Sequence, residues 1–217
     1  MNRYTSHADL GGKPGNGRVV PEPEGDPFHA PWEARAMALT LAMGATGSWN
    51  IDMSRAARET LPDYAKLDYW RIWLAGLERL LVERGLAGRD EIASGRMRHA
   101  ALPVRRVLQA EQVRAALARN PSTLRPAQSP ARFAVGARVR VRSDRPNHHT
   151  RLPGYARGRL ATVERNHGVH VFADAHALGL GEQPQWLYCG VLDAAGAAKK
   201  QRARVSFDAW EPYLEPA

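Results

Sequence analysis

The sequence predicts an α+β protein with a helical N-terminal region and a small C-terminal β-barrel. Apolar residues recur at helical spacing between residues 31 and 120, whereas they alternate with polar residues in several short segments of residues 133–217. Between the two patterns, "NPSTLRPAQSPAR" holds three prolines and predicts a linker over residues 121–132. Hydrophobic residues make up 44% of the 217 positions, so the chain can bury a core.

Residues 1–30 precede the first helical pattern. Their stretch "DLGGKPGNGRVVPEPEGDP" is rich in Gly, Pro and charge and cannot form a packed element alone. It is either a flexible tail or an extended arm laid across a partner chain.

The helical region, residues 31–120, begins at Pro31, a residue favoured in the first turn of a helix. A short second helix is expected to start with Asp52 as its N-cap and to stop at a Leu-Pro pair. Asp63 is expected to cap a longer third helix with a broad apolar face and Gly85 at its C-terminal end. "GRDEIASG" and "AEQVRAALARN" predict further short helices.

The C-terminal region carries four or five strand patterns. "RFAVGARVRVR" alternates, and so does "GRLATVERNHGVHVFAD", in which "NHG" is expected to form a turn between two strands. "QWLYCGVLD" and "RARVSFDAW" supply two more candidates. So many short strands in so few residues are typical of a small β-barrel.

The chain is basic, with 31 Lys and Arg against 22 Asp and Glu and a formal charge of +9, which favours an anionic partner. Arg138, Arg140 and Arg142 alternate along one expected strand and therefore share a face. A nucleic-acid-binding barrel is one interpretation, but aromatic side chains for base stacking do not interleave with these arginines. A solvated strand face explains them as well.

A metal site made by this chain alone is not expected, since a zinc site needs three or four converging ligands. Neighbouring histidines on a strand point to opposite faces, and Cys189 is the single cysteine, expected to be a buried structural thiol. Neither a nucleophile elbow nor a phosphate-binding glycine loop occurs. The histidines considered as ligands are His148 with His149, His167 with His170, and His176.

The composition also bears on the compartment. No apolar run approaches the roughly 18 residues that a membrane helix needs. The first residues lack the apolar core of a signal peptide. With one cysteine, no internal disulfide can form. A cytoplasmic protein without a membrane partner is expected.

Several segments together resemble the β subunit of nitrile hydratases, and they span nearly the whole chain. The resemblance rests on their order, spacing and joint presence. Among them are "DPFHAPWE" (26–33), "WNID…R" (49–55), "DYAKLDYWRIWLAGLERLLVERGL" (63–86), "HTRLPGYARGR" (149–159) and "WEPYLEPA" (210–217). Thiocyanate hydrolases resemble the same sequence cut into two chains, so the uninterrupted chain favours nitrile hydratase, with a thiocyanate hydrolase-like subunit as the alternative. A non-catalytic accessory protein that matures an α subunit is a further alternative.

The resemblance implies an enzyme that hydrates small nitriles to amides. It implies a partner α subunit whose cysteine-rich loop holds a low-spin cobalt or iron ion, with two cysteines oxidised to sulfinate and sulfenate. It implies no metal or other cofactor bound by this chain alone, and no nucleic acid. The expected assembly is an αβ heterodimer or an (αβ)2 heterotetramer, in which the β subunit has a barrel of the Src-homology-3 type and an N-terminal arm contacting its partner.

The resemblance also assigns site residues by position. Arg55 and Arg151 match arginines that bind the oxidised cysteines, and a planar guanidinium suits such an oxyanion because it can donate two parallel hydrogen bonds. The residues matching the substrate pocket are Ile51, Tyr69 and Trp73. The residues matching supporting positions are Glu59, one turn from Arg55, and His149, near Arg151. Trp73 favours cobalt, since iron enzymes tend to have tyrosine there.

Overall fold

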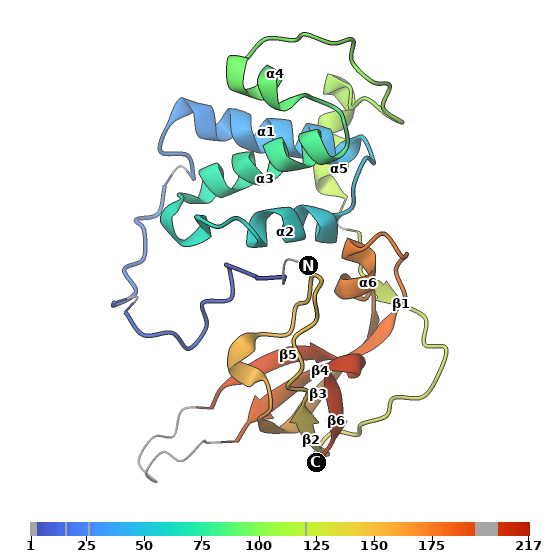
Figure 1. The fold of residues 1–217 in the computed structure, drawn as a ribbon. Coiled ribbons are helices and arrows are strands. Elements are labelled where there is room, and N and C mark those ends of the chain that lie inside the picture. The colour runs from blue at the N-terminus through green and yellow to red at the C-terminus, as the bar shows by residue number, and fades with distance from the viewer. Residues whose placement is uncertain (1–3, 16, 26, 120, 194–203) are drawn as a thin grey trace. The chain divides into compact units, whose positions relative to one another are not determined.

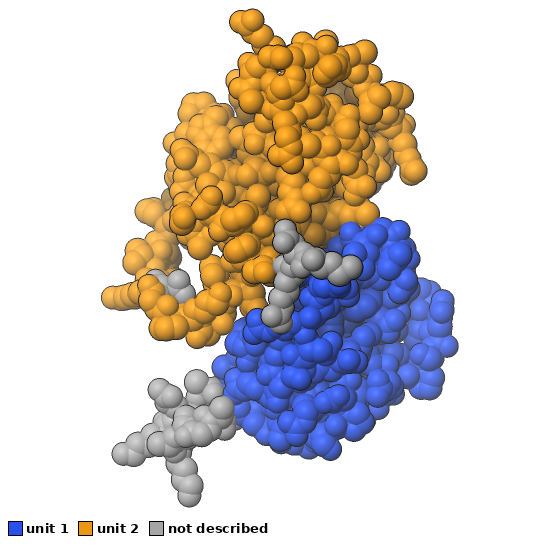
Figure 2. All heavy atoms as spheres, in the orientation of Figure 1, with its two compact units in different colours: residues 1–4, 121–217 blue, residues 5–120 orange. Residues whose placement is uncertain are grey.

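The computed structural model describes residues 4–15, 17–25, 27–119, 121–193 and 204–217. The chain divides into two compact units, drawn in Figures 1 and 2. The N-terminal unit spans Thr5–Asn120, and the C-terminal unit consists of Pro121–Ala217 together with Tyr4. The described part of the chain contains no helix that is both long and apolar enough to cross a membrane.

The N-terminal unit is helical, as predicted. Both α1 and α2 pack against α3. Its small core centres on Trp49, Ala57, Leu77 and Leu80. The helices are α1 (Pro31–Ala45), α2 (Ile51–Glu59), α3 (Tyr69–Glu83), α4 (Arg89–Ser94) and α5 (Val113–Ala118), with 3-10 turns at Tyr64–Lys66 and Ala110–Gln112.

Two predicted helix starts are wrong. The N-cap of α2 is Asn50, whose side-chain oxygen accepts hydrogen bonds from the backbone N–H groups of Asp52 (3.0 Å) and Met53 (2.9 Å). Asp52 instead lies in the first turn of α2 and is buried. Asp63 precedes a 3-10 turn, and α3 begins only at Tyr69. In both cases several residues near the start of the helix have side chains that could accept a capping hydrogen bond. The spacing of the apolar residues does not indicate which of these residues is the N-cap.

A close approach of α2 and α3 requires a glycine. A Cβ at Gly76 in α3 would lie 2.4 Å from Cγ of Arg58 in α2. We expect Gly76→Ala to lower the free energy of unfolding by about 1–3 kcal/mol, the usual cost of overpacking, measured by thermal denaturation. Gly44→Ala in α1 is the matched control, because a Cβ there meets nothing within 4 Å and alanine favours the helix. Equal melting temperatures for the two variants would contradict this account.

The C-terminal unit is built on one antiparallel sheet. Its strands are β1 (Leu124–Arg125), β2 (Arg138–Val141), β3 (Leu160–His170), β4 (Gln185–Leu192), β5 (Ser206–Trp210) and β6 (Leu214–Pro216). The order is β5-β4-β3-β2-β6, with β1 pairing to β3. A short helix, α6 (Ala173–Ala177), follows β3. The core includes Val139, Val141, Val163, Tyr188 and Phe207.

The α+β class is confirmed, but the predicted closed barrel is not. Among the described strands, β5 and β6 lie at the two ends of the sheet, which is not closed. The predicted linker also contains structure, since β1 pairs Leu124 with His170 of β3. The strand pattern "RARVSFDAW" begins outside the described residues, and β5 accounts for its second part.

The "NHG" segment is not a turn. β3 runs without interruption from Leu160 to His170, and its pairing with β4 shifts twice, between Val163 and Arg165 and between Asn166 and Gly168. Each shift leaves an extra residue on β3, which is a β-bulge. Gly168 follows the second bulge with a φ of +91°, which glycine adopts without steric cost. An Asn-His-Gly sequence suits a bulge as well as a hairpin, which explains the wrong prediction.

Candidate functional site

The first candidate group lies on α2. Arg55 Nη1 donates to Asp52 Oδ1 at 3.1 Å, one turn earlier in the helix. The Asp52 side chain is only 6% exposed, whereas that of Arg55 is 45% exposed. A buried carboxylate therefore holds one edge of a guanidinium whose remainder reaches solvent. Ile51, one turn before Arg55, is also exposed.

Glu59, the residue predicted to support Arg55, closes the same helix. Its backbone carbonyl accepts hydrogen bonds from His7 N (2.7 Å) and Ala8 N (3.3 Å), which ties the arm to the end of α2. Arg55 also binds the carboxylate of Asp52, one turn earlier in the helix. The sequence pattern predicts Asp52 as the N-cap residue and does not indicate its pairing with Arg55.

An aromatic group stands at the start of α3. Tyr69 and Trp73 contact one another with ring centroids 5.8 Å apart, as their i, i+4 spacing predicts. Trp70 contacts both, at 5.0 and 5.5 Å, and Phe28 of the arm packs on Trp70 at 5.3 Å. Tyr69 is 62% exposed. The N-terminal unit thus presents a partly exposed aromatic surface.

Arg58 links this aromatic group to α2. Its guanidinium carbon lies 4.4 Å from the centre of a Trp73 ring, a cation–π distance. Its Nε donates to the Ser54 carbonyl at 3.1 Å. Burial lowers the pKa of Arg58, although the group stays charged at neutral pH. Arg58 therefore fixes the position of Trp73 relative to Arg55, three residues earlier on the same helix.

The second candidate group lies in the C-terminal unit, in the segment between β2 and β3. His149 is only 3% exposed, and its Nδ1 lies 3.0 Å from the Tyr4 hydroxyl, with the two rings edge to face. Its backbone carbonyl accepts from His148 Nδ1 at 2.8 Å, in one tautomer of that ring. His149 is thus a fixed internal residue, while the Arg151 side chain is exposed.

A buried hydrogen-bond network anchors the backbone of Arg151. The Tyr213 hydroxyl accepts from Arg151 N (3.1 Å) and from Thr150 Oγ1 (3.3 Å), and it donates to Asp174 Oδ1. Asp174 and Tyr213 are both buried. Burial raises the pKa of Asp174, while hydrogen bonds from Tyr213, Thr150 and the Arg151 backbone act in the opposite direction. Arg151, an exposed residue, is therefore carried on a fixed backbone.

The neighbouring arginines bind carbonyl groups of the protein. Arg157 donates to the carbonyls of Asp144 and Leu152, and so braces the segment that carries Arg151. Arg159 donates to the Asp193 carbonyl at 2.7 Å. Pro153 precedes a 3-10 turn over Gly154–Ala156.

Comparison with known proteins matches both units to one family. The model for the N-terminal domain of the nitrile hydratase β subunit matches residues 4–119, and that for its C-terminal domain matches residues 122–216. The low-molecular-weight cobalt-containing nitrile hydratase subunit beta of Rhodococcus rhodochrous is 36% identical, over 96% of this chain and 98% of its own length.

The chain belongs to the nitrile hydratase β-subunit family.

Two further nitrile hydratase β subunits are similar to this chain. The nitrile hydratase subunit beta of Pseudomonas putida is 34% identical over 96% of this chain and 98% of its own length. The cobalt-containing subunit of Pseudonocardia thermophila is 27% identical over 95% and 94%. Among solved structures, a thiocyanate hydrolase apo-enzyme from Thiobacillus thioparus aligns with a TM-score of 0.39 and 22% identity, over 52% of this chain and all of that chain.

The arginines on and next to β2 have a structural role. Arg138 and Arg140 share the exposed face of β2, as predicted, whereas Arg142 is exposed but lies just after the end of the strand. Arg138 binds both carboxylate oxygens of Asp193, and Arg142 binds Asp144 at 2.9 Å. These carboxylates neutralise two of the three guanidinium groups, so the face is less positive than the sequence alone indicates.

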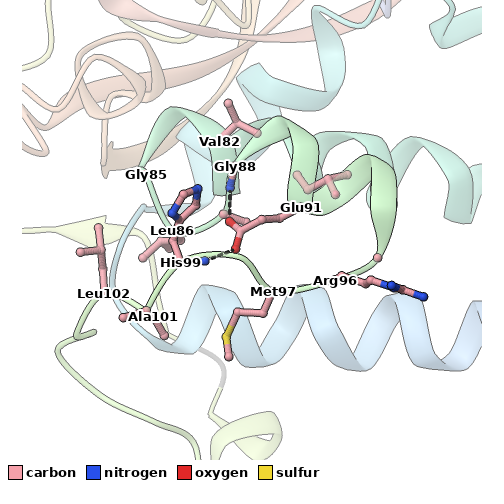
Figure 3. A pocket seen from close by; sticks show the side chains of 14 residues that line it. Val82, Gly85, Leu86, Gly88, Glu91, Arg96, Met97, His99, Ala101 and Leu102 are labelled. Carbon is pink, nitrogen blue, oxygen red and sulfur yellow. Dashed lines mark hydrogen bonds between the residues drawn. The ribbon is translucent and has the colours of Figure 1, made fainter.

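A separate pocket of about 580 Å³ lies in the N-terminal unit beside α4 and contains none of the predicted site residues (Figure 3). Glu91 lies in its wall. The backbone N–H groups of Arg98 (2.7 Å), Gly88 (2.6 Å) and His99 (3.1 Å) bind this carboxylate and lower its pKa to about 2. Glu91 therefore holds the backbone around the pocket together through these three hydrogen bonds.

Proposed function

We propose that this chain is the β subunit of a cobalt-containing nitrile hydratase and that, together with an α subunit, it hydrates nitriles to amides. The observation that carries this proposal is the family match over both units, including the segments that hold Arg55 and Arg151. The two relatives named as cobalt-containing favour cobalt over iron.

The two arginines are proposed to bind the oxidised cysteine ligands of the partner's metal. Each has an exposed guanidinium on a restrained base: Arg55 through buried Asp52, and Arg151 through the Tyr213–Asp174 network. A charge-assisted hydrogen bond to such an oxyanion contributes about 1.5–3 kcal/mol. Restraint matters because a donor already in place loses less side-chain entropy on binding.

Ile51, Tyr69 and Trp73 are proposed to line the substrate pocket. The exposure of Ile51 and Tyr69 supports this role, because apolar side chains left open on a subunit suit a pocket wall closed by its partner. Trp73 packs against Tyr69 and is itself held by the cation–π contact with Arg58. Glu59 and His149 are proposed to hold the backbone of α2 and of the Arg151 segment.

The metal is proposed to be held by the α subunit, with no ligand to it from this chain. When bound there, cobalt supplies a Lewis acid that activates nitrile or water. This chain contributes the oxyanion donors, the pocket wall and the exclusion of solvent. The assembly is proposed to be an αβ heterodimer or (αβ)2, with residues 1–30 as the arm that contacts the partner.

Co-expression with a nitrile hydratase α subunit carrying a C-x-x-C-x-C loop tests this function. We expect the two chains to copurify with bound cobalt and to convert small nitriles to amides, measured by chromatography of the product. A stable cobalt-loaded complex that leaves nitriles unchanged would contradict the proposal. Turnover of thiocyanate in place of nitriles would reassign the chain to the related hydrolases.

A further inference from the structure

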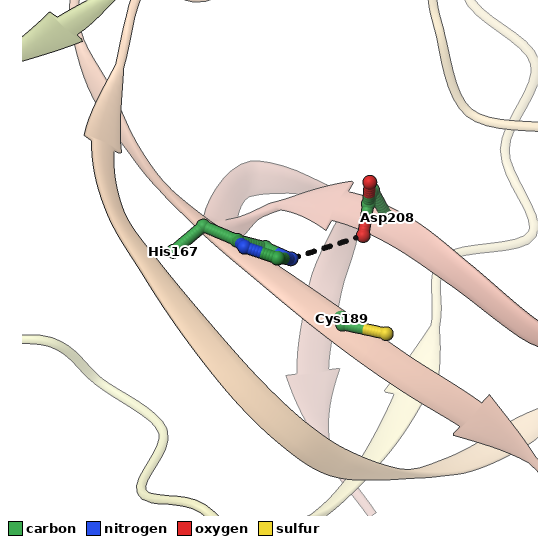
Figure 4. Close-up of side chains that lie close together, drawn as sticks. All are labelled: His167, Cys189 and Asp208. Atoms are coloured by element: carbon green, nitrogen blue, oxygen red, sulfur yellow. Dashed lines mark hydrogen bonds and ion pairs between the residues drawn. The ribbon is translucent and has the colours of Figure 1, made fainter.

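Three side chains with metal-binding atoms meet on the exposed face of the sheet. Cys189 of β4 pairs directly with Asp208 of β5, so both side chains point to the same face. His167 of β3 is the extra residue of the second bulge, between Asn166 and Gly168. Figure 4 shows the three side chains together on adjacent strands. The face they share lies opposite the core, which receives Tyr188, Phe207 and Ala209.

Their ligand atoms are close to the separation that one metal ion requires. The imidazole nitrogen of His167, the sulfur of Cys189 and a carboxylate oxygen of Asp208 all lie within 4.8 Å of one another. His167 Nε2 and Asp208 Oδ1 are 3.2 Å apart. Ligand atoms at about 2.0–2.3 Å from a tetrahedral ion are roughly 3.5 Å from each other. A small rotation of the exposed Asp208 and of Cys189 therefore suffices to bring all three onto one ion.

The nature of the donors indicates which ion they would take. One imidazole, one thiolate and one carboxylate form the mixed nitrogen, sulfur and oxygen set that suits zinc and excludes calcium or magnesium. We propose that His167, Cys189 and Asp208 form a zinc site on the β subunit itself, separate from the metal held by the α subunit. Binding replaces the hydrogen bond between His167 and Asp208 and releases the thiol proton to solvent.

The surrounding charges are compatible with a cation. Burial, then Asp208 and Glu164, raise the pKa of the Cys189 thiol, while Arg165 lowers it. Glu164 is paired with Arg204 at 2.9 Å. A divalent ion between Asp208 and the thiolate would compensate the negative charge of both. Because the side chains of Asp208 and His167 are 62% and 28% exposed, solvent can supply a fourth ligand.

The site would join three strands, of which β3 and β4 pair irregularly. β3 carries two bulges where it pairs with β4, and each bulge interrupts the ladder of hydrogen bonds. Ligands from β3, β4 and β5 would tie the bulged region to its neighbours. Zinc would therefore stabilise the bulged part of the sheet, with a water molecule as its fourth ligand.

Cobalt titration of the full chain, purified without a histidine tag, tests the site. Cys189 is the single cysteine of the sequence, so a thiolate-to-cobalt charge-transfer band can arise only from it. We expect this band to saturate at one cobalt per chain and zinc to displace it. Cys189→Ser should abolish the band, and His167→Ala or Asp208→Ala should weaken cobalt binding by more than about tenfold. His29→Ala, at an exposed histidine of the arm, should leave it unchanged.

The αβ complex gives the second measurement. We expect elemental analysis to find one zinc more per αβ pair than in the Cys189→Ser complex after growth in zinc, with similar nitrile turnover in both. This inference rests on the chain being a β subunit, but its failure is distinguishable from failure of the enzymatic function. Absence of the charge-transfer band, or cobalt binding unaffected by His167→Ala, would overturn the zinc site while leaving nitrile hydration intact.

Discussion

Arg55→Lys and Arg151→Lys are each expected to lower nitrile turnover by at least about 100-fold while the complex still assembles. Lysine keeps the positive charge but loses the planar fork that can hold two oxygens of an oxidised cysteine at once. In Arg55→Lys, the hydrogen bond from the guanidinium to Asp52 is also lost. The measurement is kcat for a small nitrile at equal cobalt content, with assembly followed by gel filtration.

Arg71→Lys is the matched control for the first of these variants. Arg71 pairs with Asp68 at the same i, i+3 spacing as Arg55 with Asp52, but both Arg71 and Asp68 are exposed. Its replacement should leave turnover within about twofold, because exposed ion pairs contribute little. Near-normal kcat in both Arg55→Lys and Arg151→Lys would refute the assignment of these arginines.

Tyr213→Phe has the next largest expected effect. It removes the hydroxyl that accepts from the Arg151 backbone and donates to buried Asp174. A buried group left without its partner costs about 1–3 kcal/mol, so the melting temperature should fall. Release of the Arg151 backbone should also lower kcat by at least about tenfold with little change in KM, because small misplacements of a catalytic group are costly.

Tyr188→Phe separates positioning from stability. Tyr188 is also buried and donates to a carboxylate, that of Glu211 at 2.5 Å, yet it has no hydrogen bond to the Arg151 segment among the described residues. This variant should lose comparable stability and keep its kcat. Equal loss of kcat in Tyr188→Phe and Tyr213→Phe would mean that Tyr213 acts only on stability.

Local patterns predicted most of the helices and strands. Pro31 begins α1, because the fixed φ of proline suits the first turn of a helix. Gly85 follows the end of α3 with a φ of +67°, which glycine adopts without steric cost. The choice of Asn50 over Asp52 as N-cap depends on which acceptor the preceding chain aligns with the free N–H groups. That alignment is set by tertiary packing and is not visible in the residue types.

Apart from the local pair of Asp52 and Arg55, the parts of the site that the sequence does not predict involve long-range partners. Asp174 and Tyr213 are 39 residues apart, and their meeting depends on α6 and the chain after β5 coming together. Cys189 was expected to be a buried structural thiol, whereas it is half-buried and lies opposite Asp208 on the outer face of the sheet. Such pairings follow from the strand register. The hydrophobic pattern shows which side chains of a strand are buried, but not which residue of the neighbouring strand lies opposite each of them.

Each bulge of β3 is a place where the strand can change its length without changing which side chains face inward. The pairs on both sides of an extra residue keep a common face with β4, so Val163 and Val169 both face inward although two extra residues lie between them. Loss of one extra residue would restore a regular ladder and leave the apolar positions beyond it facing the core. Relatives should therefore tolerate the gain or loss of single residues here, and a relative that lost the second extra residue would lose His167 with it.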